Sequence, residues 1–484
     1  MLFFIILLGF LLRFIFLINR GTFWFDELFS VHFSSLPWKE ALQMWTLETN
    51  PPFHTFFLRY FIKIFSDSEI IVRSTSLFFA LISIFLLYKL ALHLFDKKTA
   101  LFASTLLALS GTHIFVSTEA RAYSLIFMLS IFSFFLFYTI FYKENFKKNY
   151  FYIFSIVQTL LFLSHLTILL VPIIQFLSLA SFQKKKENLL LFLKAHIFPI
   201  LLFFIWFVPS VLAKWNLSTF NGWFFNYDTK MANIFTTFIA YFVVSDVSSF
   251  LQTLIILLLL GLLFFLYHTF LRKPALRPIL VSLILWAFFP ALLSNLLGIY
   301  VPKYSLFALP ALYILIGYAI SHIENSTLRR AFFLVICFLH LGPLLALVST
   351  PVYSAYKHTQ YIEKHETENS LVMTLPFQES LVLSRYFKGH SPVIGFYPYP
   401  DQMSLNERIV RHNWQSAPID DEKLDALMKR YIASKNIVFY TTYQKKDDMI
   451  YDWFIKNGWT VQEGPVAGNY VSIYLFEFHA PENH

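Results

Sequence analysis

The sequence predicts a polytopic α-helical membrane protein, of about eleven transmembrane helices, with a C-terminal α/β domain. The chain has 484 residues, of which 57% are hydrophobic and only 14% charged, whereas soluble domains carry about 25% charged residues. Apolar runs recur along most of the chain at the length of about 20 residues that a helix needs to cross a bilayer. From about residue 354 these runs give way to short β-type segments that alternate with amphipathic ones.

Eleven apolar runs are predicted to span the membrane. The first run has no basic residues before it and no small-residue cleavage site after it, so we expect it to be a retained span and not a signal peptide. The spans are 2–18, 71–93, 99–117, 123–142, 150–165, 166–182, 190–213, 248–271, 279–300, 305–323 and 331–353.

The orientation of these spans follows from the basic residues in the loops, which mark the cytoplasmic side. One alternating set of loops holds 13 Lys and Arg, and the other set of short loops holds four. We therefore predict a cytoplasmic amino terminus and, from the odd number of spans, a C-terminal domain on the extracytoplasmic side of the membrane. The basic loops are DKK (96–98), KENFKK (143–148), QKKKEN (183–188), RKPALR (272–277) and STLRR (326–330).

Two domains follow from this topology: a transmembrane module over 1–353 and an extracytoplasmic α/β domain over 354–484. The first outer loop, 19–70, contains two segments with helical spacing of aromatic and charged residues, 37–49 and 51–65, which we expect to lie in the membrane interface. In the C-terminal domain we expect strands at 369–375, 392–397, 436–443 and 471–478, and helices at 378–388, 420–433 and 446–458.

The charge distribution argues against a nucleic-acid partner. The net charge is +9, but residues 354–484 hold 13 basic and 16 acidic residues, so the membrane module holds 25 basic and 13 acidic ones. The basic excess therefore belongs to loops at a membrane surface. The one cysteine, Cys337, excludes an intramolecular disulfide and a Cys-rich metal site.

The stretch TFWFDE (22–27) places Asp26 and Glu27 beside the end of the first span. Acids in a loop are often solvated caps of a helix, but these are flanked by aromatic residues, and a carboxylate near hydrocarbon is costly unless it is used. Asp26 is a candidate general base towards a hydroxyl group, with Glu27 orienting it. The two carboxylates are also the candidate ligands if a divalent cation is bound.

Further polar residues collect in the predicted outer loops. Glu119 and Arg121 in STEARAY (117–123) form either a local ion pair, which contributes little when exposed, or a pair in which Arg binds phosphate oxygens through its planar fork of donors.

Lys303 and Tyr304 are either interfacial anchors, since both residue types favour that depth, or a cation and a hydroxyl for the same phosphate. His54 and His165 are more often satisfied interface histidines than ligands, and we treat them as neighbours of the site. A base and phosphate-binding cations at the depth of a lipid head group together favour transfer from a lipid-linked donor.

Several motifs resemble those of C-type glycosyltransferases that use polyprenyl-phosphate sugars, among them protein O-mannosyltransferases and aminoarabinose transferases. The resemblance covers 1–353, and the C-terminal domain is only loosely similar to the α/β caps of some relatives. Lys303 stands where the family usually has Arg, which would remove bidentate binding. The motifs are WFDELFS (24–30), NPPFH (50–54) with the segment that follows to residue 95, STEARAYSL (117–125), LSHLTILLVP (163–172) and VPKYSLFALPALYIL (301–315).

The resemblance implies an inverting transfer of a hexose or pentose from a polyprenyl phosphate to an acceptor glycan, lipid or protein. In this reading Asp26 deprotonates the acceptor hydroxyl, and Glu27 positions Asp26 or holds a cation. Glu119 is a second acid that orients sugar hydroxyls.

The same resemblance assigns Arg121 and Lys303 to the leaving phosphate, with Tyr304 as a further donor. Among places where the family occurs, the bacterial inner membrane fits this chain best. Two other classes of function remain open at this point: a ligase that moves a whole glycan from a polyprenyl diphosphate, and a lipid or solute transporter. A receptor anchored by its spans would not need eleven of them.

Overall fold

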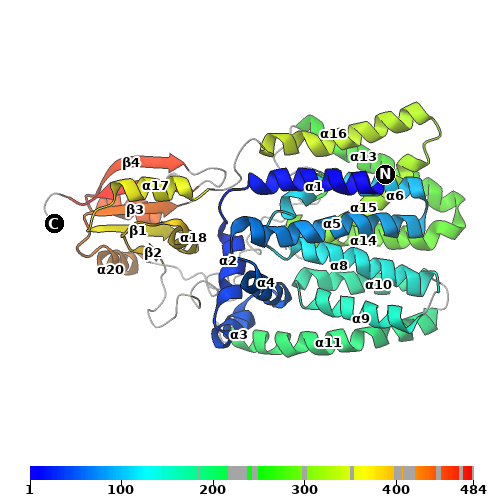
Figure 1. The fold of residues 1–484 in the computed structure, drawn as a ribbon, viewed down its shortest axis with the longest axis horizontal. Helices are drawn as coiled ribbons and strands as arrows, with labels where there is room; N and C mark the ends of the chain where they lie inside the picture. The colour runs from blue at the N-terminus through cyan, green and yellow to red at the C-terminus, as the bar shows by residue number, and fades with distance from the viewer. Residues whose placement is uncertain are drawn as a thin grey trace. The chain divides into compact units, whose positions relative to one another are not determined.

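The computed structural model divides into a helical unit and a mixed unit (Figure 1). The helical unit comprises Met1–Ile18, Glu48–Ala213 and Trp223–Val348, and the mixed unit comprises Asn19–Leu47, Lys214–Gly222 and Ser349–His484. The structure describes residues 1–144, 147–182, 185–215, 237–242, 249–296, 302–348, 354–375, 377–396, 406, 420–442, 448–467 and 473–481.

Each of the eleven predicted spans overlaps a helix or a pair of consecutive helices, and residues 248, 297–300 and 349–353 of these spans lie outside the described residues. The helices are α1 (Leu2–Ile18), α4 (Phe53–Ile64), α5 (Glu69–Leu94), α6 (Lys97–Leu109), α7 (Gly111–Val116), α8 (Tyr123–Phe137) with its extension η1 (Tyr138–Tyr142), α9 (Lys148–Phe162), η2 (Leu166–Leu169), α10 (Leu170–Leu179), α11 (Lys185–Trp215), α13 (Ser249–Arg272), η4 (Pro274–Leu276), α14 (Arg277–Leu296), η5 (Pro302–Tyr304), η6 (Leu306–Ala308), α15 (Leu309–Ser321) and α16 (Ser326–Val348).

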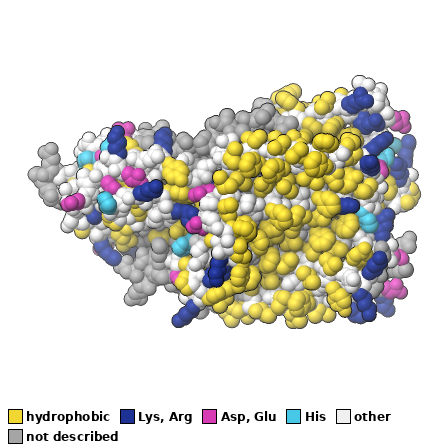
Figure 2. Space-filling view, viewed as in Figure 1, with side chains coloured by type: hydrophobic (Ala, Val, Ile, Leu, Met, Phe, Trp, Pro, Cys, Tyr) yellow, Lys and Arg dark blue, Asp and Glu magenta, His cyan; other side chains and the backbone are white. Residues whose placement is uncertain are grey.

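The helical unit has the surface of a membrane protein. Within the part of the chain that the structure describes, five segments are long and apolar enough to cross a bilayer, and three shorter apolar helices accompany them. Hydrophobic side chains cover most of the face of this unit that Figure 2 shows, while Lys and Arg gather at its right-hand end. The chain is therefore a multi-pass membrane protein, and the number of eleven crossings stays a prediction.

The predicted span 99–117 is broken at Ser110. The Ser110 side chain accepts a hydrogen bond from the backbone N–H of His113 at 3.2 Å, which caps the short helix α7. A serine whose hydroxyl binds nearby backbone groups favours a helix start over a helix interior. The break turns the chain at the end of α6 inside the unit.

Arg13, fully buried in the first helix, caps the end of α6. Its Nη1 donates to the carbonyl oxygens of Gly9 at 3.0 Å and Ala108 at 2.9 Å, and its Nη2 donates to that of Leu107 at 3.0 Å. Nη2 also donates to His113 Nδ1 at 2.8 Å. The guanidinium thus binds the Ala108 carbonyl at the end of α6 and adds a second donor to that of Leu107, which also accepts from the Ser110 N–H. The helix dipole also favours a cation at this end.

The mixed unit contains a five-stranded sheet in the order β2-β1-β3-β5-β4, with β2, β1 and β3 parallel and the other pairs antiparallel. Each of the four predicted strands and three predicted helices of this region overlaps an observed element, and residues 397, 443, 446–447 and 471–472 of these predictions lie outside the described residues. The elements are α2 (Phe25–Ser35), α3 (Trp38–Leu47), α17 (Tyr356–His365), β1 (Ser370–Leu375), α18 (Glu379–Tyr386), β2 (Val393–Gly395), α20 (Asp421–Tyr431), β3 (Ile437–Thr442), α21 (Met449–Lys456), β4 (Thr460–Ala467) and β5 (Tyr474–His479).

Strand β4 was not predicted because its sequence, TVQEGPVA, contains Gly464 and Pro465, which are rare inside strands. The strand lies at the edge of the sheet and pairs only with β5, with two register irregularities. An edge strand tolerates proline because one row of its N–H groups has no ladder partner. Gly464 has φ +135°, a backbone conformation that favours glycine.

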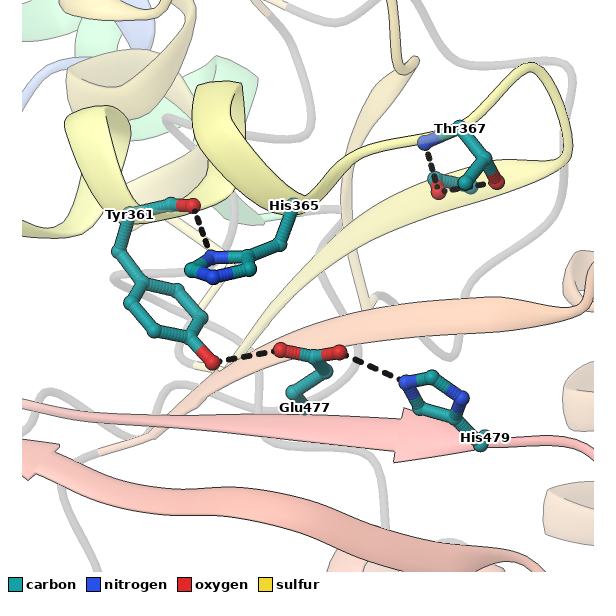
Figure 3. Close-up of polar contacts among 6 residues, drawn as sticks. Tyr361, His365, Thr367, Glu477 and His479 are labelled. Atoms are coloured by element: carbon teal, nitrogen blue, oxygen red, sulfur yellow. Dashed lines mark hydrogen bonds and ion pairs between the residues drawn. The ribbon is translucent and has the colours of Figure 1, made fainter.

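Helix α17, which was also not predicted, is fastened to the sheet through Glu477 of β5. The Tyr361 hydroxyl donates to Glu477 Oε2 at 2.6 Å, and His479 Nε2 lies 2.6 Å from Glu477 Oε1 (Figure 3). His365 Nδ1 hydrogen-bonds the Tyr361 carbonyl oxygen at 2.8 Å. Burial and the neighbouring Glu477 carboxylate raise the pKa of the Tyr361 hydroxyl, so it stays a donor at neutral pH.

The first part of the predicted outer loop packs within the mixed unit. Helix α2 contacts α18, and the Tyr386 hydroxyl accepts a hydrogen bond from the backbone N–H of Phe23 at 2.8 Å. The Arg385 guanidinium lies 5.4 Å from the centre of the Phe23 ring, and Thr22 Oγ1 accepts from the N–H of Ala355 at 3.0 Å. The assignment of 1–353 as one catalytic module stays a prediction.

We expect Asp448→Ala to destabilise the mixed unit by about 3 kcal/mol, because the carboxylate is buried and its partners would be left without an acceptor. Its Oδ2 accepts from the hydroxyls of Tyr440 at 2.7 Å and Thr442 at 2.6 Å, and its Oδ1 accepts from the N–H of Ile450 at 2.9 Å. Hydrogen exchange of the β3 amides in the full-length protein measures the loss.

Asp420→Ala is the matched control. Asp448 and Asp420 are the N-cap residues of α21 and α20, but the Asp420 side chain is 64% exposed. It is expected to cost only about 1 kcal/mol. Equal loss of protection in the two variants would contradict the importance of the buried hydroxyl bonds.

Candidate functional site

Asp26 and Glu27 lie in the first turn of α2. Asp26 is half-buried and Glu27 is buried. Glu27 Oε2 accepts a hydrogen bond from the backbone N–H of Trp24 at 3.4 Å, and Ser30 Oγ donates to the Asp26 carbonyl oxygen at 3.2 Å. Glu27 therefore closes the turn that presents Asp26.

The local sequence explains why the helix starts here. Trp24 is extended, with φ −88° and ψ 172°, and the glutamate at the third helical position reaches back to it, which is the second half of a capping box. Two carboxylates in a first turn also interact favourably with the positive end of the helix dipole. Both acids thus support the start of a helix, whatever further role they have.

Glu119 and Arg121 lie in the turn between α7 and α8. The Glu119 carbonyl oxygen accepts from Ser76 Oγ at 2.5 Å and from the Arg121 backbone N–H at 2.8 Å. The Glu119 side chain is buried and that of Arg121 is half-buried. The turn is thus held against α5 by its backbone, which fixes where the Arg121 side chain starts.

Three aromatic rings and a lysine meet beside this turn in the helical unit. The ring centres of His165 and Tyr304 are 5.1 Å apart, and the Tyr123 ring lies 6.0 Å from His165 and 6.3 Å from Tyr304. Lys303 Nζ lies 5.3 Å from the centre of the Tyr123 ring, in the range of a cation–π contact. The positive charges of Arg121 and Lys303 both act on His165. We call these five residues the cation–aromatic cluster.

His165 has one ring nitrogen available as a donor. Its Nδ1 accepts from the backbone N–H of Thr167 at 3.3 Å and lies 2.9 Å from Thr167 Oγ1, so the proton of the neutral ring is on Nε2. Nε2 is buried and has no hydrogen-bond partner among the described residues. Asn50 Oδ1 fixes the same turn by accepting from the N–H of Leu166 at 3.3 Å.

His54 lies at the start of α4, which is tied to the end of α9 by a hydrogen bond from the N–H of Phe53 to the Leu163 carbonyl oxygen at 2.8 Å. Burial, and then the positive charge of Arg121, lower the pKa of His54 from 6.5 to about 3. His54 is therefore uncharged at neutral pH and cannot hold a phosphate by its charge.

We expect His54 to destabilise the fold as the pH falls from 6.5 towards 3. In this window the unfolded chain binds a proton that folded His54 does not, so the unfolding free energy decreases by about 1.4 kcal/mol per pH unit on account of this residue. The melting temperature of His54→Gln should accordingly decrease less steeply with acid than that of the native protein. His390→Gln, at an exposed position, is the control, and parallel curves for His54→Gln and the native protein would contradict the expectation.

The structure brings together Arg121, His165, Lys303 and Tyr304, with His54 close enough to feel the charge of Arg121. Sequence reasoning missed Tyr123, which contacts three members of the cluster. Its signal was the aromatic position two residues after Arg121 in STEARAYSL (117–125), where α8 begins. The predicted roles of all these residues stay predictions.

The structure adds no ligand set for a metal ion. Among the residues that are described, no three His, Cys, Asp or Glu side chains are grouped in a way that could hold one. Asp26 and Glu27 would offer two carboxylates, and a divalent cation takes further oxygens from water or substrate. A cation at this pair stays a hypothesis.

Residues 49–213 match the family model described as dolichyl-phosphate-mannose-protein mannosyltransferase. This segment begins just before α4 and ends in the last turn of α11. The fold is similar to that of ArnT from Cupriavidus metallidurans bound to undecaprenyl phosphate, with a TM-score of 0.60 and 12% identity over 98% of this chain and 97% of that chain. The apo state of the same protein gives a TM-score of 0.59 and 13% identity over 96% and 95% of the two chains.

A third similar structure is the archaeal oligosaccharyltransferase AglB from Archaeoglobus fulgidus, in complex with an inhibitory peptide and a dolichol-phosphate. Its TM-score is 0.52, with 11% identity over 91% of this chain and 69% of that chain. None of the curated proteins matches the chain in sequence.

The chain has the fold of the C-type glycosyltransferases, and its resemblance to them is confirmed. The similarity to ArnT extends over nearly the whole length of both chains. The coverage includes the mixed unit as well as the helical one.

Proposed function

We propose that the protein is a glycosyltransferase that moves one monosaccharide from a polyprenyl-phosphate donor to an acceptor hydroxyl group. The observation that supports this function most directly is the cation–aromatic cluster in a chain of this fold. Arg121 and Lys303 supply two positive charges, and His165 supplies a buried N–H that has no partner among the residues the structure describes. A monophosphate attached to a membrane lipid is an anion of the size and charge that such a cluster suits.

In the proposed reaction the Asp26 carboxylate takes the proton of the acceptor hydroxyl, and the oxygen attacks the anomeric carbon of the sugar. The bond between that carbon and the phosphate oxygen breaks, and its electron pair leaves with polyprenyl phosphate. Attack opposite the leaving group inverts the anomeric configuration. Glu27 holds the turn that presents Asp26, and Glu119 is the proposed partner of the sugar hydroxyls.

The cations act on the leaving group, where negative charge grows in the transition state. Lys303 is a point charge, so it attracts the phosphate without fixing its orientation. An Arg at this position would fix the orientation through two hydrogen bonds. The Tyr304 hydroxyl and His165 Nε2 are the neutral donors that would orient it. The ring of Tyr123 holds the Lys303 ammonium group near the cluster.

For the topology, we propose eleven crossings with a cytoplasmic amino terminus and an extracytoplasmic C-terminal region, in a bacterial inner membrane. The gathering of Lys and Arg at one end of the helical unit supports this orientation (Figure 2). The acceptor is a glycan, lipid or protein that reaches the protein from outside the cytoplasm. ArnT and AglB were solved with undecaprenyl phosphate and dolichol-phosphate, which supports a polyprenyl carrier.

We expect Arg121→Ala to weaken binding of the polyprenyl-phosphate donor about 10- to 100-fold, because a hydrogen bond between charged groups contributes about 1.5–3 kcal/mol. Folding should change little, since the side chain is only half-buried. Titration of the detergent-purified protein with polyprenyl phosphate measures the affinity. Lys148→Ala, an exposed cation at the start of α9, is the control, and an unchanged affinity in Arg121→Ala would remove Arg121 from the phosphate site.

A further inference from the structure

Helices α13, α15 and α16 enclose an apolar groove of about 530 Å³ in the helical unit. Side chains such as Leu258 of α13, Ile320 of α15 and Phe332 of α16 line it. Both α13 and α16 pack on α15 (Figure 1), and the groove lies between them. Leu257 and Val335 on its edges are 59% and 44% exposed, so the groove opens on the surface that would face the hydrocarbon of a membrane.

One end of the groove lies at the basic turn between α15 and α16, and the basic turn between α13 and α14 contacts the same end of α15. Ile323 and Ala331 line the groove, and Arg329 Nη1 donates to the carbonyl oxygen of Ile323 at 2.9 Å. Lys273 Nζ lies 3.4 Å from the hydroxyl of Tyr318, on the helix α15 that forms the groove floor. These contacts place Arg329 beside the end of the groove, and they place Lys273 at the same end of α15.

The charge around this mouth is strongly unbalanced. The two turns contain five cations and one carboxylate, Glu324, and they lie on the surface of the unit. Basic residues next to a membrane surface attract anionic lipids, by about 1 kcal/mol each. The five cations are Arg272, Lys273, Arg277, Arg329 and Arg330.

We propose that this groove binds one phospholipid with an anionic head group. An acyl chain fills the apolar groove, and the phosphate lies at Lys273 and Arg329. A bare apolar groove would accept any hydrophobic segment, but the cations at its mouth require an occupant with an apolar tail and an anionic end.

The groove is distinct from the proposed donor site. Lys303 precedes α15, whereas Arg329 follows it, and the 13 residues of α15 span about 20 Å. The donor phosphate and this lipid phosphate would therefore be bound at opposite ends of the same helix. The lipid would stabilise the packing of α13 and α16 and would take no part in transfer.

Gly261 offers a direct test, because a Cβ at this position meets no atom within 4 Å and the residue lines the groove. Gly261→Trp should fill the groove without disturbing the helices. Leu260→Trp, on the same helix at a position that is 57% exposed, is the matched control. Native mass spectrometry of the delipidated protein, titrated with dioleoyl phosphatidylglycerol, counts the bound lipid.

We expect one tightly bound phosphatidylglycerol on the native protein and on Leu260→Trp, and at least tenfold weaker binding on Gly261→Trp. The double variant Lys273→Gln/Arg329→Gln should weaken phosphatidylglycerol binding about 10- to 30-fold and leave phosphatidylcholine binding unchanged. Lys148→Gln, a cation of another basic turn, should change neither.

Three results would overturn the proposal: equal affinity for phosphatidylcholine, undiminished binding to Gly261→Trp, or displacement of the bound phosphatidylglycerol by polyprenyl phosphate. A second copy of the chain as the occupant would instead appear as a dimer that Gly261→Trp dissociates. Because the site is remote from the proposed donor cations, none of these results depends on whether sugar transfer takes place.

Discussion

Asp26→Asn is expected to lower the rate of sugar transfer by about 10²–10⁴-fold, the usual contribution of a general base. The carboxamide has nearly the shape of the carboxylate but cannot take the proton of the acceptor hydroxyl. Since Asp26 is half-buried and its backbone carbonyl accepts the Ser30 hydrogen bond, the substitution leaves the α2 turn in place. Folding and membrane insertion should stay as in the native protein.

The release of polyprenyl phosphate from its sugar measures this rate. Asp67→Asn, an exposed acid of the same predicted outer loop, is the control and should keep full activity. Glu27→Gln separates positioning from base catalysis, because it weakens the contact to the Trp24 N–H and should lower the rate less than Asp26→Asn does. Full activity in Asp26→Asn would remove Asp26 from the mechanism.

Arg13→Met is expected to cost about 2–6 kcal/mol of folding free energy. Without its guanidinium the carbonyl oxygen of Ala108 and the Nδ1 of His113 lose their donor, whereas the Leu107 carbonyl oxygen keeps the Ser110 N–H. Each buried acceptor left without a partner costs about 1–3 kcal/mol. Relief from burying a charge offsets part of that cost. Methionine fits the space of the arginine side chain but donates no hydrogen bond, so the loss of folding free energy comes from the missing hydrogen bonds.

Lys194→Met is the matched control, since Lys194 is another cation within a predicted span and its side chain is exposed. The melting temperature in detergent should fall strongly for Arg13→Met, partly for Arg13→Lys and hardly for Lys194→Met. Equal melting temperatures for the native protein and Arg13→Met would show that Arg13 does not hold the end of α6.

Much of the fold could be predicted because bilayer-length apolar runs leave few alternatives to helices. Span 2–18 coincides with α1, and 71–93 lies within α5. The break at Ser110 could not be predicted, since one serine in an apolar run is equally compatible with an unbroken helix. Whether the helix breaks there depends on Arg13, which lies about a hundred residues away in the sequence.

The candidate site was predictable only in part, for a similar reason. Arg121 and Lys303 stand in motifs that resemble a known family, so the sequence alone named them. The role of Tyr123 depends on contacts among three segments that are distant in the sequence. No local sequence pattern predicts those contacts. In the same way, the contact between Phe23 and Tyr386 joins positions 363 residues apart.

The central claim is tested most directly by identifying the lipid that the protein retains. The full-length protein would be purified in mild detergent, its lipids extracted, and the extract analysed by mass spectrometry beside that of Arg121→Ala. We predict a polyprenyl monophosphate, with or without one hexose- or pentose-sized group, that is enriched in the native protein and depleted in the variant. A polyprenyl diphosphate carrying a glycan, or no polyprenyl species even after donor is added, would contradict transfer from a polyprenyl-phosphate sugar.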